Sequence, residues 1–269
     1  SFGWDIQVNY SKNNNTIEEL YDDIDVYALG GFDNLQILAH VGGEYGEIWG
    51  TTYKRVEDKN SPYFGKMILT ADGLPQGNTE KKKIGSQVPD ALVGVTNTFS
   101  YKGLALSFLI DGRFGGEMFS TTNQAMQAAG TAAVTAPGGV RNDMTLDGVI
   151  ASGTDFIPNT KSITTQQYWA TVTGATGNLG IGEANIYDAT NIRLRTLQLT
   201  YDLPSKLLAN TILQRVKVGF SANNLWLISS HMNGVDPEST FATGTNAVGF
   251  ENTAPPTSRT YLFNITLGF

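Results

Sequence analysis

Apolar and polar residues alternate in several long stretches of this sequence. From Phe2 to Tyr10 the even-numbered positions are apolar or aromatic, and the odd-numbered positions are polar or glycine. Similar alternation recurs at 92–101, 104–110, 195–203, 215–227 and 258–269, and less clearly at 35–40, 47–56 and 65–71. A period of two residues is typical of β-strands that have two different faces. The sequence therefore predicts an all-β fold.

The polar faces of these strands consist mostly of Thr, Ser, Gly, Asn and Gln. Charged residues make up only 16% of the chain, against about a quarter in an average domain. Aromatic residues lie near the strand ends and aliphatic residues nearer the middle, which is the order of a membrane barrel with an aliphatic belt between aromatic girdles. We therefore predict a transmembrane antiparallel β-barrel, with small polar residues lining a watery interior. The alternative is a soluble β-sandwich whose apolar faces pack on a second sheet.

The barrel interpretation assigns one face of each strand to lipid. The residues expected to face the membrane are Trp4, Ile6, Val8, Leu199, Val218, Phe220, Phe263, Ile265, Leu267 and Phe269.

The connections between strands are of two kinds. Short turns are expected at 102–103 and 204–211, and long loops at about 115–190 and 229–257. This alternation is typical of periplasmic turns and extracellular loops. A loop of some 75 residues is unusual unless it is functional and contains small elements of its own. A short helix capped by Thr16 is expected just after the first strand.

Composition excludes several classes of function. The net charge of −7 argues against nucleic acid, and the absence of cysteine excludes disulfides, thiol nucleophiles and cysteine-containing zinc sites. Only two histidines occur, His40 and His231. Ser230 is adjacent to His231, so on a strand the two side chains point to opposite faces. We expect no enzyme activity, no cofactor and no metal site.

Several local strings resemble the C-terminal part of SusC/RagA-type TonB-dependent outer-membrane transporters, which import nutrients in Bacteroidetes. They are WDIQVNYSKNNN, GGEYGEIWGTTYKR, NTFSYKGLALSFLIDGRFGGEMF, DATNIRLRTLQLTYDLP, VGFSANNLWLIS, GVDPES and SRTYLFNITLGF, in this order along the chain. The segment 120–187 matches almost nothing in the family. The resemblance implies that residues 1–269 are the C-terminal eight or nine strands of a 22-stranded barrel. The plug domain and the early strands would then lie outside this chain, which we expect to be a fragment.

The resemblance also implies partners. These are the rest of the barrel and its plug, a SusD-like surface lipoprotein, the TonB complex reached through the missing N-terminal part, outer-membrane lipid, and an oligosaccharide or peptide as cargo. The competing hypothesis is a secreted, soluble β-sandwich that binds glycans.

Candidate binding residues lie in the two long loops. Phe119, Tyr168, Trp169 and Phe241 are candidate aromatic platforms for a sugar or a peptide, although aromatic side chains that pack within the loops are at least as common. In GVDPES, Pro237 fixes a turn that leaves Asp236 and Glu238 able to point outward, where the resemblance suggests contact with the lipoprotein. A solvated turn is the simpler alternative.

Two arginines lie at or just before the start of the alternating stretch 195–203. Arg193 and Arg195 have the parity of Leu197 and Leu199. We therefore expect them on the outward face, where they would meet lipopolysaccharide phosphates or anchor the strand at the membrane interface.

Overall fold

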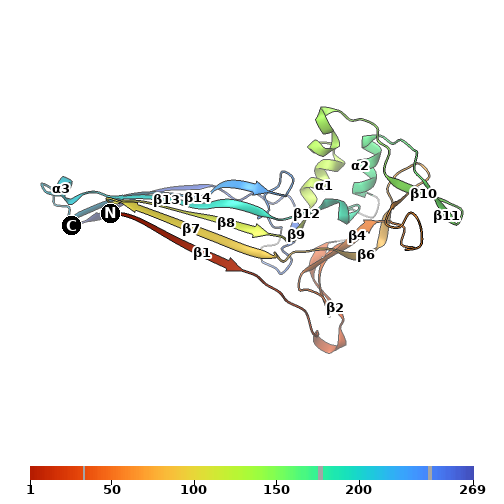
Figure 1. The fold of residues 1–269 in the computed structure, drawn as a ribbon, viewed down its shortest axis with the longest axis horizontal. Helices are drawn as coiled ribbons and strands as arrows, with labels where there is room; N and C mark the ends of the chain where they lie inside the picture. Colours follow the sequence, from red (N-terminus) through yellow and green to blue (C-terminus); the bar gives the residue numbers. More distant parts are fainter. Residues whose placement is uncertain (33, 175–177, 242–243) are drawn as a thin grey trace.

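The computed structural model describes residues 1–32, 34–174, 178–241 and 244–269. The protein is elongated (Figure 1), with a long six-stranded sheet at one end and a mixed module of short strands and helices at the other. We call these parts the wall sheet and the outer module. None of the described helices is long and apolar enough to cross a membrane.

The wall sheet is antiparallel throughout, in the order β1-β7-β8-β13-β14-β16. Its strands are β1 (Phe2–Ser11), β7 (Ala91–Tyr101), β8 (Leu104–Phe114), β13 (Asn191–Asp202), β14 (Arg215–Ser230) and β16 (Thr260–Gly268). Six strands lie in this sheet rather than the eight or nine expected. The stretches near 35–40, 47–56 and 65–71 form strands of the outer module instead.

The strand register places the apolar residues of all six strands on one face. Across β8, β13, β14 and β16, the residues Leu106, Leu199, Phe220 and Phe263 lie opposite one another in turn. On the other side of β8, Phe99 of β7 lies opposite Leu106, and Trp4 of β1 lies opposite Phe99. Because residues directly opposite each other share a face, these rows form one continuous apolar surface.

The apolar surface is exposed. Val8 is 61% exposed, Leu199 40% and Val218 38%. Of the ten residues predicted to face lipid, nine are exposed and Phe220 is half-buried, because it packs against the rings of Tyr261 and Phe263. The dry, two-sheet core of the sandwich alternative is therefore absent at these positions.

Asn97 interrupts the apolar face of β7, directly opposite Ile6. Its side-chain oxygen accepts a hydrogen bond of 3.1 Å from the indole N–H of Trp4. Partnering one polar group with another lowers the cost of placing an amide on an apolar surface.

All the long insertions leave the wall sheet at the same end. At the opposite end β7 and β8 are joined by Lys102 and Gly103 alone, both with positive φ, 45° and 83°. This two-residue turn matches the right-handed twist of the paired strands. A Cβ on Gly103 would lie 2.7 Å from the carbonyl oxygen of Asp202, so the position requires glycine. The connection from β13 to β14 at this end holds only the short helix α3 (Ser205–Leu208).

The outer module contains three small sheets. The first has the order β2-β3-β4-β6, the second β11-β10-β5 and the third β12-β9-β15. Their strands are β2 (Val26–Phe32), β3 (Leu35–His40), β4 (Glu47–Tyr53), β5 (Met67–Leu69), β6 (Gly77–Ser86), β9 (Glu117–Ser120), β10 (Gly148–Ser152), β11 (Asp155–Pro158), β12 (Ile186–Asp188) and β15 (Phe250–Glu251). The helices are α1 (Thr121–Ala128) and α2 (Thr165–Gly174), with the 3₁₀ turns η1 (Tyr21–Asp23), η2 (Ala133–Thr135), η3 (Pro137–Gly139) and η4 (Gly182–Asn185).

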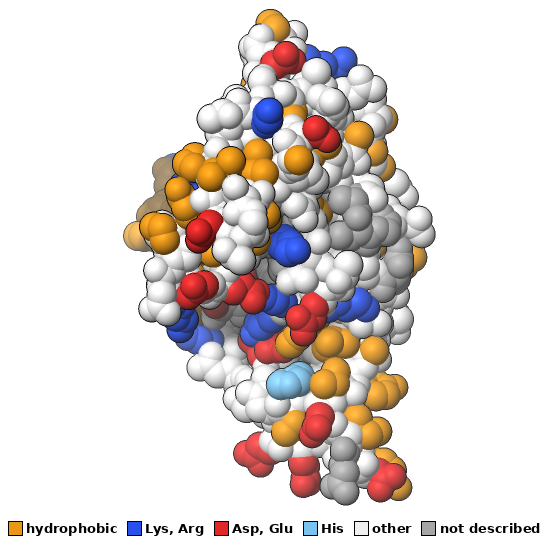
Figure 2. Space-filling model, turned by 90° about the vertical axis from the view of Figure 1, so that its right-hand side faces the viewer, with side chains coloured by type: hydrophobic (Ala, Val, Ile, Leu, Met, Phe, Trp, Pro, Cys, Tyr) orange, Lys and Arg blue, Asp and Glu red, His pale blue; other side chains and the backbone are white. Residues whose placement is uncertain are grey.

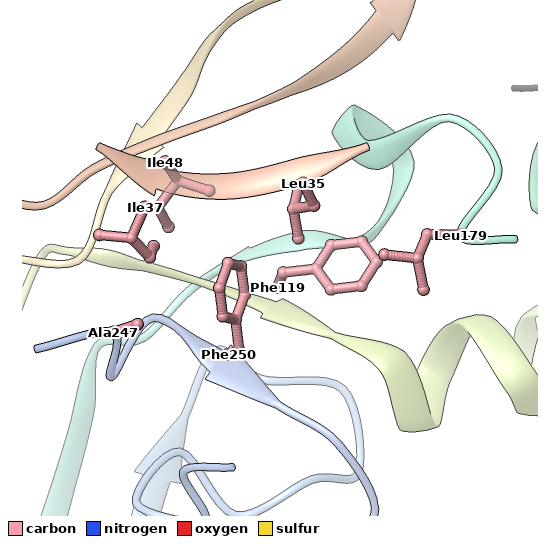
Figure 3. Close-up of a cluster of buried hydrophobic side chains, with 7 residues drawn as sticks. All are labelled: Leu35, Ile37, Ile48, Phe119, Leu179, Ala247 and Phe250. Atoms are coloured by element: carbon pink, nitrogen blue, oxygen red, sulfur yellow. The ribbon is translucent and has the colours of Figure 1, made fainter. Parts of the chain in front are cut away.

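The core of the outer module is built from three insertions between strands of the wall sheet, residues 12–90, 115–190 and 231–259 (Figure 3). The first insertion provides Leu35, Ile37 and Ile48, the second Phe119 and Leu179, and the third Ala247 and Phe250. Burial of these side chains stabilises the module by about 1.5–3 kcal/mol for each large residue. The described parts of the segments 115–190 and 229–257 therefore contribute to one folded unit and are not free loops.

The helix predicted to begin at Thr16 is not formed, and only the 3₁₀ turn η1 (Tyr21–Asp23) lies in that segment. Residues 12–20 contain no helix. Ile17 instead exchanges backbone hydrogen bonds with the turn at 42–43, at 2.9 and 2.8 Å. This tertiary pairing prevails over a local capping signal, whose contribution is only about 1 kcal/mol.

Candidate functional site

A β-bulge in β13 decides the direction of two arginine side chains. Leu194 lies opposite Ile110, but Thr196 lies opposite Leu109, so Arg195 is the extra residue. A shift of one residue moves every later side chain to the other face. Arg193 and Arg195 consequently extend toward the polar face of the wall sheet, and Leu194 takes the apolar side. The outward placement predicted for both arginines is wrong, because alternation alone cannot detect a bulge.

Arg193 is buried and bound on several sides. Its side chain is 4% exposed and forms an ion pair with Asp236 through Nη2. The remaining donors reach Asn191 Oδ1 at 3.3 Å and Thr257 Oγ1 at 3.0 Å. Asp236 also accepts from Thr257, at 2.9 Å from the backbone N–H and 2.6 Å from the hydroxyl.

Arg195 makes a parallel set of contacts beside it. Its guanidinium donates to Asp111 Oδ2 at 2.8 and 2.9 Å and to Asn224 Oδ1 at 2.9 Å. It also pairs with both oxygens of Glu238, at 2.8 Å for the Nη1–Oε2 contact. Charge-assisted bonds of this kind are about twice as strong as neutral ones. We call Arg193, Arg195, Asp236 and Glu238 the double ion pair.

The double ion pair fastens the third insertion to the wall sheet. Both carboxylates of GVDPES turn onto arginines instead of outward, and the Asp236 side chain is only 10% exposed. The predicted outward orientation of Asp236 and Glu238 is therefore wrong. The turn chemistry at Pro237 was visible in the sequence, but the arginines that attract the carboxylates lie 43 residues away.

The protonation of these carboxylates follows from their contacts. Burial acts to raise the pKa of Asp236, but the hydrogen bonds from Thr257, Arg193 and the backbone N–H of Glu238 outweigh it and hold the pKa below its usual value. The pKa of Glu238 is also lowered, chiefly by the hydrogen bonds from Arg195. Both groups are charged at neutral pH.

Of the four candidate aromatic platforms, Phe119 is not at a surface. It is fully buried at the centre of the module core, beside Phe250 and Leu179 (Figure 3). A role in contacting cargo is therefore wrong for Phe119. Its position in β9, hydrogen-bonded to β12 at the far end of the same insertion and to β15 of the third insertion, could not be read from local sequence.

Tyr168 and Trp169 form one aromatic pair on α2. Their ring centroids are 4.9 Å apart in an edge-to-face arrangement, a favoured geometry for aromatic side chains. Trp169 lines a hollow of about 320 Å³ between the two helices, together with Gln166, Arg141 and Gln127. Tyr168 points the other way, with its hydroxyl 3.5 Å from that of Tyr53.

Tyr53 belongs to a second hollow of about 500 Å³. In its wall, Arg55 donates to both oxygens of Glu183, at 2.9 and 2.6 Å, and its guanidinium lies 5.6 Å from the centre of the Tyr53 ring. Burial, followed by the proximity of Tyr168, raises the pKa of Tyr53, which stays protonated. Trp169 lines the first hollow and Tyr53, the hydroxyl partner of Tyr168, lines the second. Both volumes are within the usual range of about 300–1,000 Å³ for ligand sites.

Phe241 is 52% exposed in the third insertion. Its backbone N–H donates to Phe250 O at 2.8 Å. It lines neither of the two hollows.

Tyr53, Arg55 and Glu183 were not predicted as site residues, because the ion pair between Arg55 and Glu183 joins positions 128 apart.

Comparison with known proteins agrees with this architecture. No protein-family model matches the chain. The chain is 24% identical over 290 residues to TonB-dependent receptor P3 of Formosa agariphila, an alignment that covers 100% of the chain and 27% of the receptor. It is 27% identical over 191 residues to TonB-dependent receptor P26 of the same organism, covering 69% of the chain and 18% of the receptor.

Solved structures match over the whole chain as well. The RagAB peptide transporter superimposes with a TM-score of 0.63 at 18% identity, and the RagAB peptide importer in its closed-closed state with 0.63 at 19%. Each superposition includes 100% of this chain and 27% of the matched transporter chain. The chain is therefore similar over its whole length to a TonB-dependent receptor, and its fold matches a C-terminal portion of a SusC/RagA-type transporter.

Proposed function

We propose that this chain forms part of the wall and of the extracellular face of a TonB-dependent importer of nutrients. The observation that carries the proposal is the wall sheet, with one exposed apolar face, one polar face and every long insertion at the same end (Figure 1). A lipid-facing belt and a watery interior require this arrangement. The relationship to TonB-dependent receptors supports it.

In the complete protein the wall sheet would be part of a closed 22-stranded barrel around a plug domain. The chain spans 27% of the length of the first relative, so most of the barrel lies outside it. The outer edges of β1 and β16 then pair with strands of the missing part, since an open edge in lipid leaves backbone groups unsatisfied. The plug and the contact with the TonB complex belong to that part too.

The outer module, including segments 115–190 and 229–257, would face the outside of the cell and meet a SusD-like lipoprotein. Support comes from the resemblance to RagAB transporters. We assign Asp236 and Glu238 an indirect part in this contact: through Arg193 and Arg195 they hold the turn at Pro237 in place.

Cargo capture would take place at the two hollows, one lined by Trp169 and the other by Tyr53. The first hollow combines an indole ring with amide, hydroxyl and guanidinium groups, which suits an oligosaccharide or a peptide equally. No bond in the cargo needs to be broken, and the relatives are named as receptors and transporters.

The test uses the full-length transporter in cells that lack their own copy. We expect Trp169→Ala to lower uptake and binding of the preferred cargo at least tenfold, with unchanged amounts of protein in the outer membrane. Phe241→Ala is the control, because that ring lines neither hollow, and it should leave uptake unchanged. Equal uptake by the Trp169→Ala variant would contradict the site, and a protein that is monodisperse without detergent would contradict the barrel and favour the soluble glycan-binding module.

A further inference from the structure

The four-stranded sheet of the outer module has two edges of opposite chemistry. At one edge, β6 contains the run Glu80-Lys81-Lys82-Lys83. Charged side chains, lysine above all, are a common means by which natural proteins prevent another strand from pairing with an edge. At the other edge, β2 has the sequence VYALGGF, with no charged residue and no proline.

The unprotected edge is also exposed and apolar. Val26 is 43% exposed and Tyr27 58%, and just before the strand Tyr21 is 87% and Ile24 44% exposed. Within the described residues, β2 pairs only with β3. Figure 1 shows β2 at a projecting corner of the module, and hydrophobic side chains gather there at the lower end of Figure 2.

The surroundings of this edge are strongly acidic. Residues 16–32 include five carboxylates and no lysine or arginine. Glu18, Glu19, Asp22 and Asp25 are exposed, and acidic side chains surround the lower end of the molecule in Figure 2. A strand that pairs here meets a negative field, which favours basic partners and disfavours acidic ones.

We propose that the free edge of β2 is a docking site for an extended segment of a separate protein, in which apolar residues alternate with Lys or Arg. The segment adds a fifth strand to the sheet, with backbone hydrogen bonds supplying affinity. The apolar side chains pack on the face of Tyr27, and the alternating basic ones, on the opposite face with Val26, reach the carboxylates of Glu18, Glu19, Asp22 and Asp25. The proposal is independent of cargo import, which can take place with the edge of β2 free.

The absence of cysteine from the chain makes a site-specific test possible. A single cysteine is placed by Tyr27→Cys in the full-length transporter, free of other cysteines, and labelled in intact cells with a benzophenone maleimide. After illumination, the products are separated by mass and the cross-linked peptides are sequenced by mass spectrometry. Lys82→Cys in β6 is the matched control at the protected edge of the same sheet.

The proposal predicts one cross-linked product with Tyr27→Cys, in which the attached peptide belongs to another protein and alternates apolar and basic residues. The Lys82→Cys variant should yield at most a tenth of the amount of this cross-linked product. The double reversal Glu18→Lys with Glu19→Lys should lower the yield at least fivefold, whereas reversal of Asp72 and Asp155, which are exposed elsewhere in the module, should not.

Three results would overturn it. They are a cross-link within the same polypeptide or to a second copy of it, an attached segment without basic residues, and equal yields at Tyr27 and Lys82. Uptake of cargo is measured in parallel, so that a failure of docking is told apart from a failure of import. A difference in gel mobility between heated and unheated samples shows that each variant is folded.

Discussion

Arg195 and Glu238 are 43 residues apart and meet at 2.8 Å where the wall sheet joins the outer module. Their neighbours Arg193 and Asp236 form a second ion pair that is almost completely buried. The third insertion, which supplies Phe250 and Ala247 to the core of the module, is fastened to the wall by these contacts. The folded outer module therefore depends on charges that the wall sheet presents.

The two ion pairs should differ in strength according to their burial. Asp236→Asn removes the nearer counter-charge of a guanidinium that is 4% exposed and leaves it only Glu238, 3.6 Å away, and we expect a loss of about 3 kcal/mol. Glu238→Gln acts on a pair with side chains 25% and 31% exposed, and should cost about 1 kcal/mol. Limited proteolysis within 231–259 and urea titration in detergent measure the loss of stability in each variant. Equal losses in the two variants would contradict this ranking.

The attachment of the third insertion to the wall sheet should weaken only at low pH. Asp236 and Glu238 have folded-state pKa values below those of the unfolded chain, so their stabilisation is fully present above about pH 4.5. It is lost as the pH falls through the lowered, folded-state values. Proteolysis of 231–259 should be constant between pH 8 and pH 5 and increase below pH 4. An increase already at pH 6 would show that other groups control the attachment.

Substitution on the two faces of β13 should have unequal effects. Leu199→Arg places a charge on the apolar surface, and we expect it to destabilise the barrel by about 2–4 kcal/mol if the position is near the bilayer midplane. Gln198→Arg, one residue earlier on the polar face, should be within about 0.5 kcal/mol of the parent protein. Refolding into lipid vesicles gives both values. A similar loss for Gln198→Arg would contradict a watery interior.

Phe250→Ala should loosen the outer module and leave the wall sheet intact. Phe250 is 1% exposed and contacts core residues of the other two insertions, and removal of a buried phenylalanine costs about 3–5 kcal/mol. Hydrogen exchange should increase in β3, β4 and β9 but not in β7, β8 or β14. Unchanged exchange in β3 would mean that the insertions fold independently.

Glu251, next to Phe250, should contribute in a different way. It is 1% exposed, and its carboxylate accepts hydrogen bonds from Ser120 at 2.8 Å and from Thr122 at 2.5 Å, at the start of α1. Glu251→Leu leaves these buried donors unpaired and should cost about 1–3 kcal/mol, with faster exchange confined to α1. Glu251→Gln keeps an acceptor and should retain most of the stability.

The wall sheet could be predicted because its signal is local. In β1, β7 and β16 the side-chain alternation gives the face of each residue directly, and Gly103 marks a tight turn. The bulge at Arg195 could not be predicted in this way, because it depends on the pairing of β13 with its neighbours. Between Leu194 and Thr196, β13 advances by two residues while β8 advances by one and β14 by three.

The outer module could not be predicted from local patterns. Leu35, Phe119 and Phe250 become one core only when the wall sheet brings three insertions to the same end. For the same reason Phe119 resembled a binding residue, and Tyr53, Arg55 and Glu183 gave no signal before their positions in space were known.

The central claim is that the apolar face of the wall sheet contacts lipid, and spin labels at single cysteines test it most directly. Labels replace Val8 and Leu199 on that face, and Gln7 and Gln198 on the other, in the full-length protein reconstituted in lipid. We predict that oxygen relaxes the labels at 8 and 199 more than a water-soluble nickel chelate does, and that the order reverses at 7 and 198. Labels at 8 and 199 that neither reagent reaches would mean a dry protein interior and would contradict the account.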